Sequence, residues 1–90
     1  MLDDDMRRRR IRVRAWRRGM REMDILMGSF VDARVETLPA AALDELETLL
    51  DLPDATVFGW LSGAEQPPAE HDTPVLRQII AFHQHDGPIH

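Results

Sequence analysis

A helical spacing of apolar residues, interrupted by glycine and proline, constrains the fold of this 90-residue chain most strongly. From Met20 onward, apolar side chains recur three or four positions apart, which places them on one face of an α-helix. The first run consists of Met20, Met23, Met27, Phe30 and Val31, and Arg34 continues its spacing. Glycine and proline divide the rest of the chain into segments of helical length. The pattern predicts helices with short connections, and it holds no convincing β-hairpin signal.

Three further helices are predicted downstream. One opens at Thr37-Leu38-Pro39 with proline in its first turn, a short one covers about 54–62 before Gly63, and the last begins near Thr73. In the first of these helices, the residues expected to face the core are Leu43, Leu46, Leu49 and Leu50. In the short helix they are Val57, Phe58 and Leu61, with Trp60 at the border of the core. In the last helix they are Val75, Leu76, Ile79, Ile80 and His83.

The segment from Met6 to Arg18 allows two interpretations. Alternation of Ile11, Val13 and Ala15 with Arg12, Arg14 and Trp16 resembles a strand. A helix instead gathers the residues into two stripes and needs no partner strand, so we predict a helix that Gly19 ends or bends. The basic stripe, interpreted mainly as a solvated face, is Arg7, Arg10, Arg14, Arg17, Arg18 and Arg21, and the apolar stripe is Met6, Val13, Trp16 and Met20.

Together these segments predict an all-α protein, a compact five-helix bundle. One domain over 1–90 is expected, with an ordered core at about 6–85 and flexible ends. The chain has no cysteine, no apolar run near the ~18 residues that span a bilayer, and no secretory signal. We therefore expect a cytoplasmic protein without membrane insertion.

Charge is unevenly distributed along the chain. Residues 1–21 hold nine arginines and three aspartates (+6), and residues 22–90 hold two arginines and thirteen acids (−11), which gives the net charge of −5. There is no lysine, so every basic side chain is a guanidinium suited to carboxylate or phosphate. A partner with an acidic patch, or a bound phosphate, is expected at the basic end.

Catalytic and metal-binding patterns are weak. His83 and His85 would point to different sides of a helix, which does not suit a shared metal ion. The glycines do not form a phosphate-binding pattern, and the positions of Ser, His and Asp along the sequence do not suggest a catalytic triad. The acids are spread along outer helix faces. The sequence therefore predicts no enzyme activity, no catalytic residue, no metal site and no stably bound cofactor.

The stretch Arg18-Gly19-Met20-Arg21-Glu22 resembles the R-G-x-x-E motif of the succinate dehydrogenase flavinylation factor family, which is related to mitochondrial succinate dehydrogenase assembly factor 2. Flanking residues agree with the family over most of 10–83. They are Arg14-Ala15-Trp16, Met23-Asp24, Gly28-x-Phe30-x-Asp32, Phe58-Gly59-Trp60-Leu61 and Pro68-Ala69-Glu70. The Arg7–Arg10 run and the lack of lysine depart from familiar members.

The resemblance implies an assembly chaperone that binds the flavoprotein subunit of succinate dehydrogenase, or of fumarate reductase, and promotes covalent attachment of FAD by the flavoprotein's own histidine. The implied partner-binding motif is Arg18, Gly19 and Glu22, with Arg17, Arg21 and Asp24 beside it. Glu22 could alternatively be a carboxylate that reaches back to first-turn amides. The alternative function is an arginine-rich helical nucleic-acid-binding regulator or antitoxin, disfavoured because the acidic remainder repels phosphate.

Overall fold

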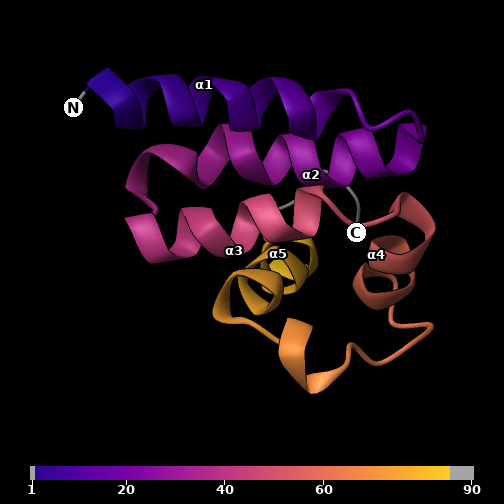
Figure 1. Cartoon of the computed structure of the whole chain (residues 1–90). Coiled ribbons are helices and arrows are strands. Elements are labelled where there is room, and N and C mark those ends of the chain that lie inside the picture. The colour runs from indigo at the N-terminus through magenta and orange to yellow at the C-terminus, as the bar shows by residue number, and fades with distance from the viewer. Residues whose placement is uncertain (1, 86–90) are drawn as a thin grey trace.

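The computed structural model describes residues 2–85, which form five α-helices and two short 3-10 helices (Figure 1). The α-helices are α1 (Leu2–Trp16), α2 (Arg21–Arg34), α3 (Ala40–Leu50), α4 (Asp54–Leu61) and α5 (Pro74–His85), and the 3-10 helices are η1 (Val35–Thr37) and η2 (Ala69–His71). No strand occurs in the described range. The predicted all-α, five-helix fold is confirmed, and the predicted flexible C-terminal end lies outside the described residues.

The first three helices run roughly along one another, and α5 crosses beneath α2 and α3 (Figure 1). The short helix α4 lies at the end of this layer, on the side where α1 turns into α2 (Figure 1). This arrangement brings the connection between α1 and α2 near the connection between α3 and α4.

The core is apolar and draws side chains from all five helices. Phe30 is fully buried and meets Phe82 edge to face, with the ring centroids 5.7 Å apart. Phe82 was not among the residues predicted for the inner face of α5, whereas His83 lies at its border. Most of the predicted stripes of α2 and α3 is confirmed, since Met23, Met27, Phe30, Val31, Leu43, Leu46, Leu49 and Leu50 are all buried. Met20 and Arg34, which were predicted to continue the α2 stripe, are only partly buried, and Met20 precedes the helix.

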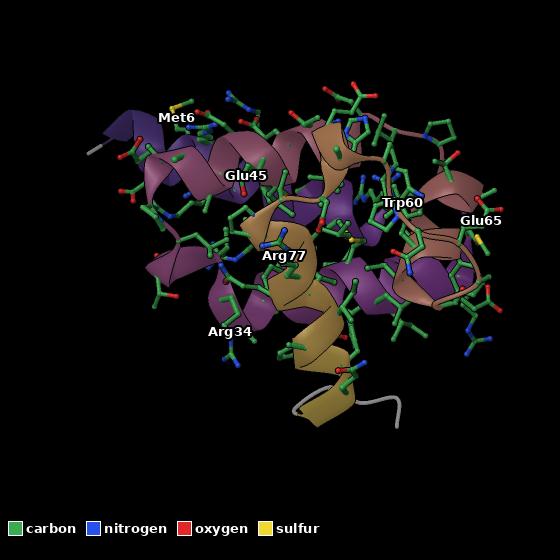
Figure 2. All side chains as sticks on the ribbon, turned by 90° about the horizontal axis from the view of Figure 1, so that it is seen from below. Met6, Arg34, Glu45, Trp60, Glu65 and Arg77 are labelled. Atoms are coloured by element: carbon green, nitrogen blue, oxygen red, sulfur yellow. The ribbon has the colours of Figure 1, made fainter. Side chains whose placement is uncertain are left out.

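In α4 the order of burial differs from the prediction. Trp60 is buried and stacks on His71, with centroids 5.4 Å apart, whereas Phe58 and Leu61 are only partly buried. Figure 2 shows Trp60 between α4 and the segment that contains η2. Because η2 covers this side of α4, the aromatic residue expected at the border becomes part of the core.

The interpretation of the N-terminal segment as a helix is confirmed, with different ends. Helix α1 begins at Leu2 rather than Met6 and ends at Trp16 rather than Arg18. Its fully buried residues are Ile11 and Ala15, whereas the predicted apolar stripe is largely exposed. The arginines explain this orientation. They contact acids and carbonyls of η1, α3 and the segments that follow these two elements, which fixes the side of α1 that faces inward.

Local signals set the helix ends. Thr73 caps α5, because its Oγ1 accepts a hydrogen bond from the Leu76 amide at 3.2 Å. Glu45 of α3 accepts from the Val75 amide at 3.2 Å, which satisfies a second amide of the same turn. Pro39 is the N-cap residue of α3 rather than a member of its first turn. Gly63, with a φ of +83°, follows the end of α4 as predicted.

Candidate functional site

The predicted site lies on the connection from α1 to α2. Gly19 is exposed there and has a φ of +99°, a left-handed conformation that side chains disfavour. A Cβ atom built on Gly19 would meet nothing within 4 Å. Glycine is therefore required by the backbone conformation and not by crowding. It lies within the connection, since α1 has already ended at Trp16.

Asp24 fixes the shape of this connection. Its Oδ1 accepts a hydrogen bond from the Arg18 amide at 2.7 Å, and its own amide donates to the Met20 carbonyl at 2.9 Å. A carboxylate in the first turn of α2 is also favoured by the helix dipole. The interpretation of Glu22 as the acid that reaches back is wrong, because α2 has no side-chain cap at Met20 and Asp24 makes the backward contact.

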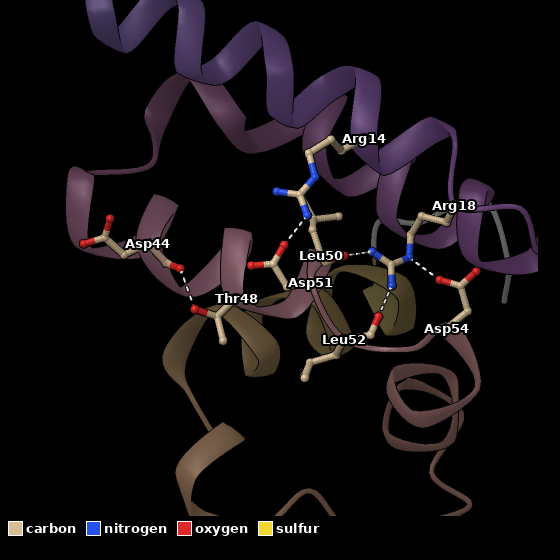
Figure 3. A network of polar contacts seen from close by, with 8 residues as sticks. All are labelled: Arg14, Arg18, Asp44, Thr48, Leu50, Asp51, Leu52 and Asp54. Atoms are coloured by element: carbon tan, nitrogen blue, oxygen red, sulfur yellow. Dashed lines mark hydrogen bonds and ion pairs between the residues drawn. The ribbon is translucent and has the colours of Figure 1, made fainter.

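The Arg18 side chain is directed into the protein, and only 5% of it is exposed (Figure 3). Its Nη1 donates to the Leu50 carbonyl at 2.8 Å and its Nη2 donates to the Leu52 carbonyl at 2.6 Å. Its Nε donates to Oδ1 of Asp54, whose side chain is 20% exposed. The guanidinium thus uses three donors on three separate acceptors of the chain.

These acceptors lie where α3 ends and α4 begins. Leu50 is the last residue of α3, so its carbonyl has no partner within the helix, and a cation there complements the helix dipole. Asp54 is the first residue of α4 and provides the opposite charge. Arg18 therefore joins the α1–α2 connection to the α3–α4 connection, and three of the five donors of its guanidinium are engaged inside the chain.

Four other predicted residues are exposed and form what we call the turn surface: Arg17, Gly19, Arg21 and Glu22. Within residues 2–85, the side chains of its three charged members make no hydrogen bond or ion pair. The structure thus divides the six predicted residues into this exposed group and a supporting pair, buried Arg18 and half-buried Asp24.

A largely apolar groove of about 570 Å³ begins at Glu22 and runs between α2, α4 and α5. Its lining residues include Leu26, Phe58, Leu61, Ile80 and His83. Nε2 of His83 lies 2.7 Å from the Leu26 carbonyl and must donate to it, whereas the buried Nδ1 has no partner within the described residues. Sequence reasoning missed this groove, because its walls come from three helices that are distant in the chain.

Comparison with known proteins identifies the family of this chain. The family model described as flavinator of succinate dehydrogenase matches residues 9–83. The chain belongs to this family. A FAD assembly factor of Acetobacter pasteurianus is 43% identical over 82% of this chain and 68% of its own length. One from Legionella pneumophila strain Paris is 33% identical over 73% of this chain and 77% of its own length.

A mitochondrial relative extends the range of the family. Succinate dehydrogenase assembly factor 2 of Dictyostelium discoideum is 30% identical over 91% of this chain, which spans 57% of that relative's length. No solved structure matches the chain significantly. These relatives belong to a family of assembly factors and not of catalytic enzymes.

Three of the flanking residues that resemble the flavinator family meet in space. The Trp16 ring lies on the backbone of Gly28, and its Nε1 donates to Oδ2 of Asp32 at 3.1 Å. This contact packs the C-terminal end of α1 against α2. The spacing of these residues along the sequence did not predict the contact, since each could equally have been an independent surface or core residue.

The partners of Arg18 were also missed by sequence reasoning. Asp54 follows Pro53 at a predicted helix start, which marks it as a first-turn acid but does not indicate which cation it meets. Leu50 and Leu52 contribute backbone carbonyls, and these carry no sequence signal. The site of this flavinator-family chain is therefore supported by groups that no motif records.

Within residues 2–85, no group of three or more His, Cys, Asp or Glu side chains is arranged to hold a metal ion. His71 stacks on Trp60, and His83 contacts the Leu26 carbonyl. None of the described helices has the length and apolar character needed to cross a bilayer.

Proposed function

We propose that this chain is a cytoplasmic assembly chaperone that binds the flavoprotein subunit of succinate dehydrogenase and promotes covalent attachment of FAD to that subunit. The flavoprotein subunit of fumarate reductase is the alternative partner. The proposal rests on membership of the flavinator family and on the names of the bacterial relatives, which describe FAD assembly. The chain itself would hold no FAD stably.

The turn surface is the proposed contact with the flavoprotein, and one observation carries this assignment. Arg17, Arg21 and Glu22 have no side-chain partner within residues 2–85, although the connection that presents them is fixed by Arg18 and Asp24. Unpaired charged groups on a fixed backbone can bind a partner without first breaking an internal contact and without reordering of the main chain. Arg18 and Asp24 would act as positioning residues.

The proposed action is differential binding. A chaperone accelerates bond formation only when it binds the reactive arrangement of the flavoprotein and FAD more tightly than the other arrangements. Arg17 and Arg21 can pair with carboxylate or phosphate, and Glu22 can accept hydrogen bonds from the partner. The covalent bond would be formed between groups of the flavoprotein and FAD, without a nucleophile from this chain.

The nucleic-acid alternative loses its main support in the structure. Five arginines of the basic segment are engaged within the chain: Arg7, Arg8, Arg12, Arg14 and Arg18. The interpretation of the basic stripe as mainly solvated is correct for Arg10, Arg17 and Arg21, and also for Arg14, which is exposed although it pairs with Asp51. It is wrong for Arg7 and Arg18. Fewer free guanidinium groups remain for phosphate contacts.

A reconstitution tests the proposal. The chain is mixed with apo-flavoprotein subunit and FAD, and protein-linked flavin fluorescence is measured after denaturing electrophoresis. Covalent flavin should rise with added chain, and Glu22→Ala should weaken partner binding and reduce the rise. The matched control is Glu70→Ala, because Glu70 is another exposed glutamate without a described partner, placed on η2. No rise with a competent cognate subunit would overturn the proposal.

A further inference from the structure

Helix α1 exposes an apolar surface with a basic border. Met6 is 50% exposed, Val13 48% and Trp16 41%, and they are the only large hydrophobic residues classed as exposed in the described part of the chain. Arg9, Arg10 and Arg17 lie among them and are exposed as well. We call these six residues the outer face of α1. Figure 2 shows Met6 at the periphery, with its side chain directed away from the bundle.

Helix geometry confirms that this surface is continuous. At about 100° per residue, the five members within α1 fall in an arc of about 120°. Ile11 and Ala15, which are fully buried, lie on the opposite side. The outer face is therefore one long stripe along the helix, and at its C-terminal end the Trp16 ring packs against Gly28 of α2.

The arginines of α1 divide along the same line. Toward the protein, Arg7 pairs with Glu47 at 2.6 Å, Arg12 pairs with Glu36 at 2.6 Å, and Arg14 pairs with Asp51. The side chains of Arg9, Arg10 and Arg17 make no hydrogen bond or ion pair to any residue in 2–85. Within the described residues, acidic side chains pair with the inward arginines of α1 and none pairs with the outward ones.

Trp16 gives the outer face a fixed aromatic group. Its ring rests on Gly28 and its Nε1 is bound to Asp32, so the indole cannot turn inward to bury its exposed part. An aromatic side chain that is already held in place loses little conformational entropy when a partner covers it. Tryptophan, methionine and arginine are also the residue types enriched at the centres of protein interfaces.

We infer that the outer face of α1 is a second docking surface for the flavoprotein subunit, and that it takes an apolar patch bordered by carboxylates. This inference rests on the proposed function. Charge complementarity selects the occupant, since three free guanidinium groups match carboxylates while the apolar residues between them match an apolar centre. Nucleic acid and anionic membranes fit less well, because the protein carries a net charge of −5.

The outer face and the turn surface are contiguous. Arg17 belongs to both, because it follows the last residue of α1 and begins the connection to α2. The two surfaces nevertheless have different compositions, since the turn surface has charged groups around a glycine and the outer face has an apolar centre. The outer face provides affinity for the subunit, and the turn surface provides the contact that favours flavin attachment.

The test compares two double variants on the same helix. Arg9→Gln with Arg10→Gln removes two charges from the outer face, and Arg12→Gln with Arg14→Gln removes two charges from exposed ion pairs on the inner side. Affinity for apo-flavoprotein subunit is measured by calorimetry at two salt concentrations. The outer pair should weaken binding about tenfold and reduce its salt dependence, and the inner pair should change it less than threefold.

A third variant tests the apolar centre. Met6→Ser with Val13→Ser leaves Trp16 on Gly28 and keeps all charges, and circular dichroism confirms folding. The concentration of chain that gives half-maximal flavinylation should rise about tenfold. If wild type and both outer-face variants bind the apo-flavoprotein subunit with equal affinity, the inference is overturned. Flavinylation by the wild-type chain would in that case still support the proposed function. Binding of wild type and variants to phosphatidylglycerol vesicles and to duplex DNA is measured as well. If the outer-face variants lose binding to vesicles or DNA but still bind the subunit, the inference is also overturned.

Discussion

The indole of Trp16 lies directly on the backbone of Gly28, so that a Cβ atom at residue 28 would be 2.3 Å from its Cδ2 and Cε2 atoms. No real Cβ atom approaches a ring so closely. The indole is also held by its hydrogen bond to Asp32, which limits its ability to move away. This pair therefore sets the distance between the end of α1 and the middle of α2.

Gly28→Ala should destabilise the protein despite the better helix propensity of alanine. Overpacking costs about 1–3 kcal/mol, which outweighs the gain of about 1 kcal/mol from replacing a helical glycine. In a Trp16→Ala background the added methyl group has space, so the same substitution should become neutral or stabilising. Urea unfolding followed by circular dichroism measures both differences. An equal loss in both backgrounds would show that the indole is not the obstacle.

Arg18→Met should lower the free energy of unfolding by about 3 kcal/mol, because it leaves a partly buried carboxylate and two carbonyls without their donors. Arg14→Met is the matched control, since Arg14 and Asp51 form an exposed pair worth about 0–1 kcal/mol. Arg18→Lys should fall between them because an ammonium cannot reach all three acceptors as a planar fork does. Equal unfolding midpoints for the two methionine variants would contradict this account.

The helices could be predicted from the sequence because their apolar spacing is local information. The buried residues of α2 and α3 follow directly from that spacing, as Met27 and Leu46 illustrate. The orientation of α1 could not be predicted in this way. Arginines are as numerous as apolar residues on that helix. Its inward side depends on acids such as Glu47 and Asp51, which lie far along the chain.

The candidate site shows the same division. A motif can indicate that Arg18, Gly19 and Glu22 belong together, but it does not reveal that Arg18 points inward. That result depends on the carbonyls of Leu50 and Leu52, whose positions exist only after α3 and α4 have packed. Backbone acceptors are the same for every residue type, so no sequence pattern records them.

Asp72 and Arg77 should produce a small dependence of stability on acid pH. Nε of Arg77 donates to Oδ1 of Asp72 at 3.0 Å, and this hydrogen bond lowers the pKa of the Asp72 carboxyl below its ordinary value of about 3.8. The stabilisation of the folded state by this pair is therefore complete above the ordinary pKa of about 3.8, and it disappears as the pH falls through the lowered pKa of the folded state. Carboxyl-carbon NMR of wild type and Arg77→Gln measures the effect. A titration midpoint that did not rise in the variant would refute the assignment.

Gly19→Arg should leave a folded helical protein that no longer supports flavinylation. The φ of +99° at this position imposes a backbone cost of about 1–2 kcal/mol on any side chain, and the open space around it avoids a clash. Gly63→Arg is the matched control, because Gly63 has a φ of +83°, equally open surroundings and a place outside the turn surface. Similar losses of stability are expected for both variants in thermal unfolding, with loss of flavinylation for Gly19→Arg alone. Equal flavinylation by the two variants would instead show that Gly19 contributes only to folding.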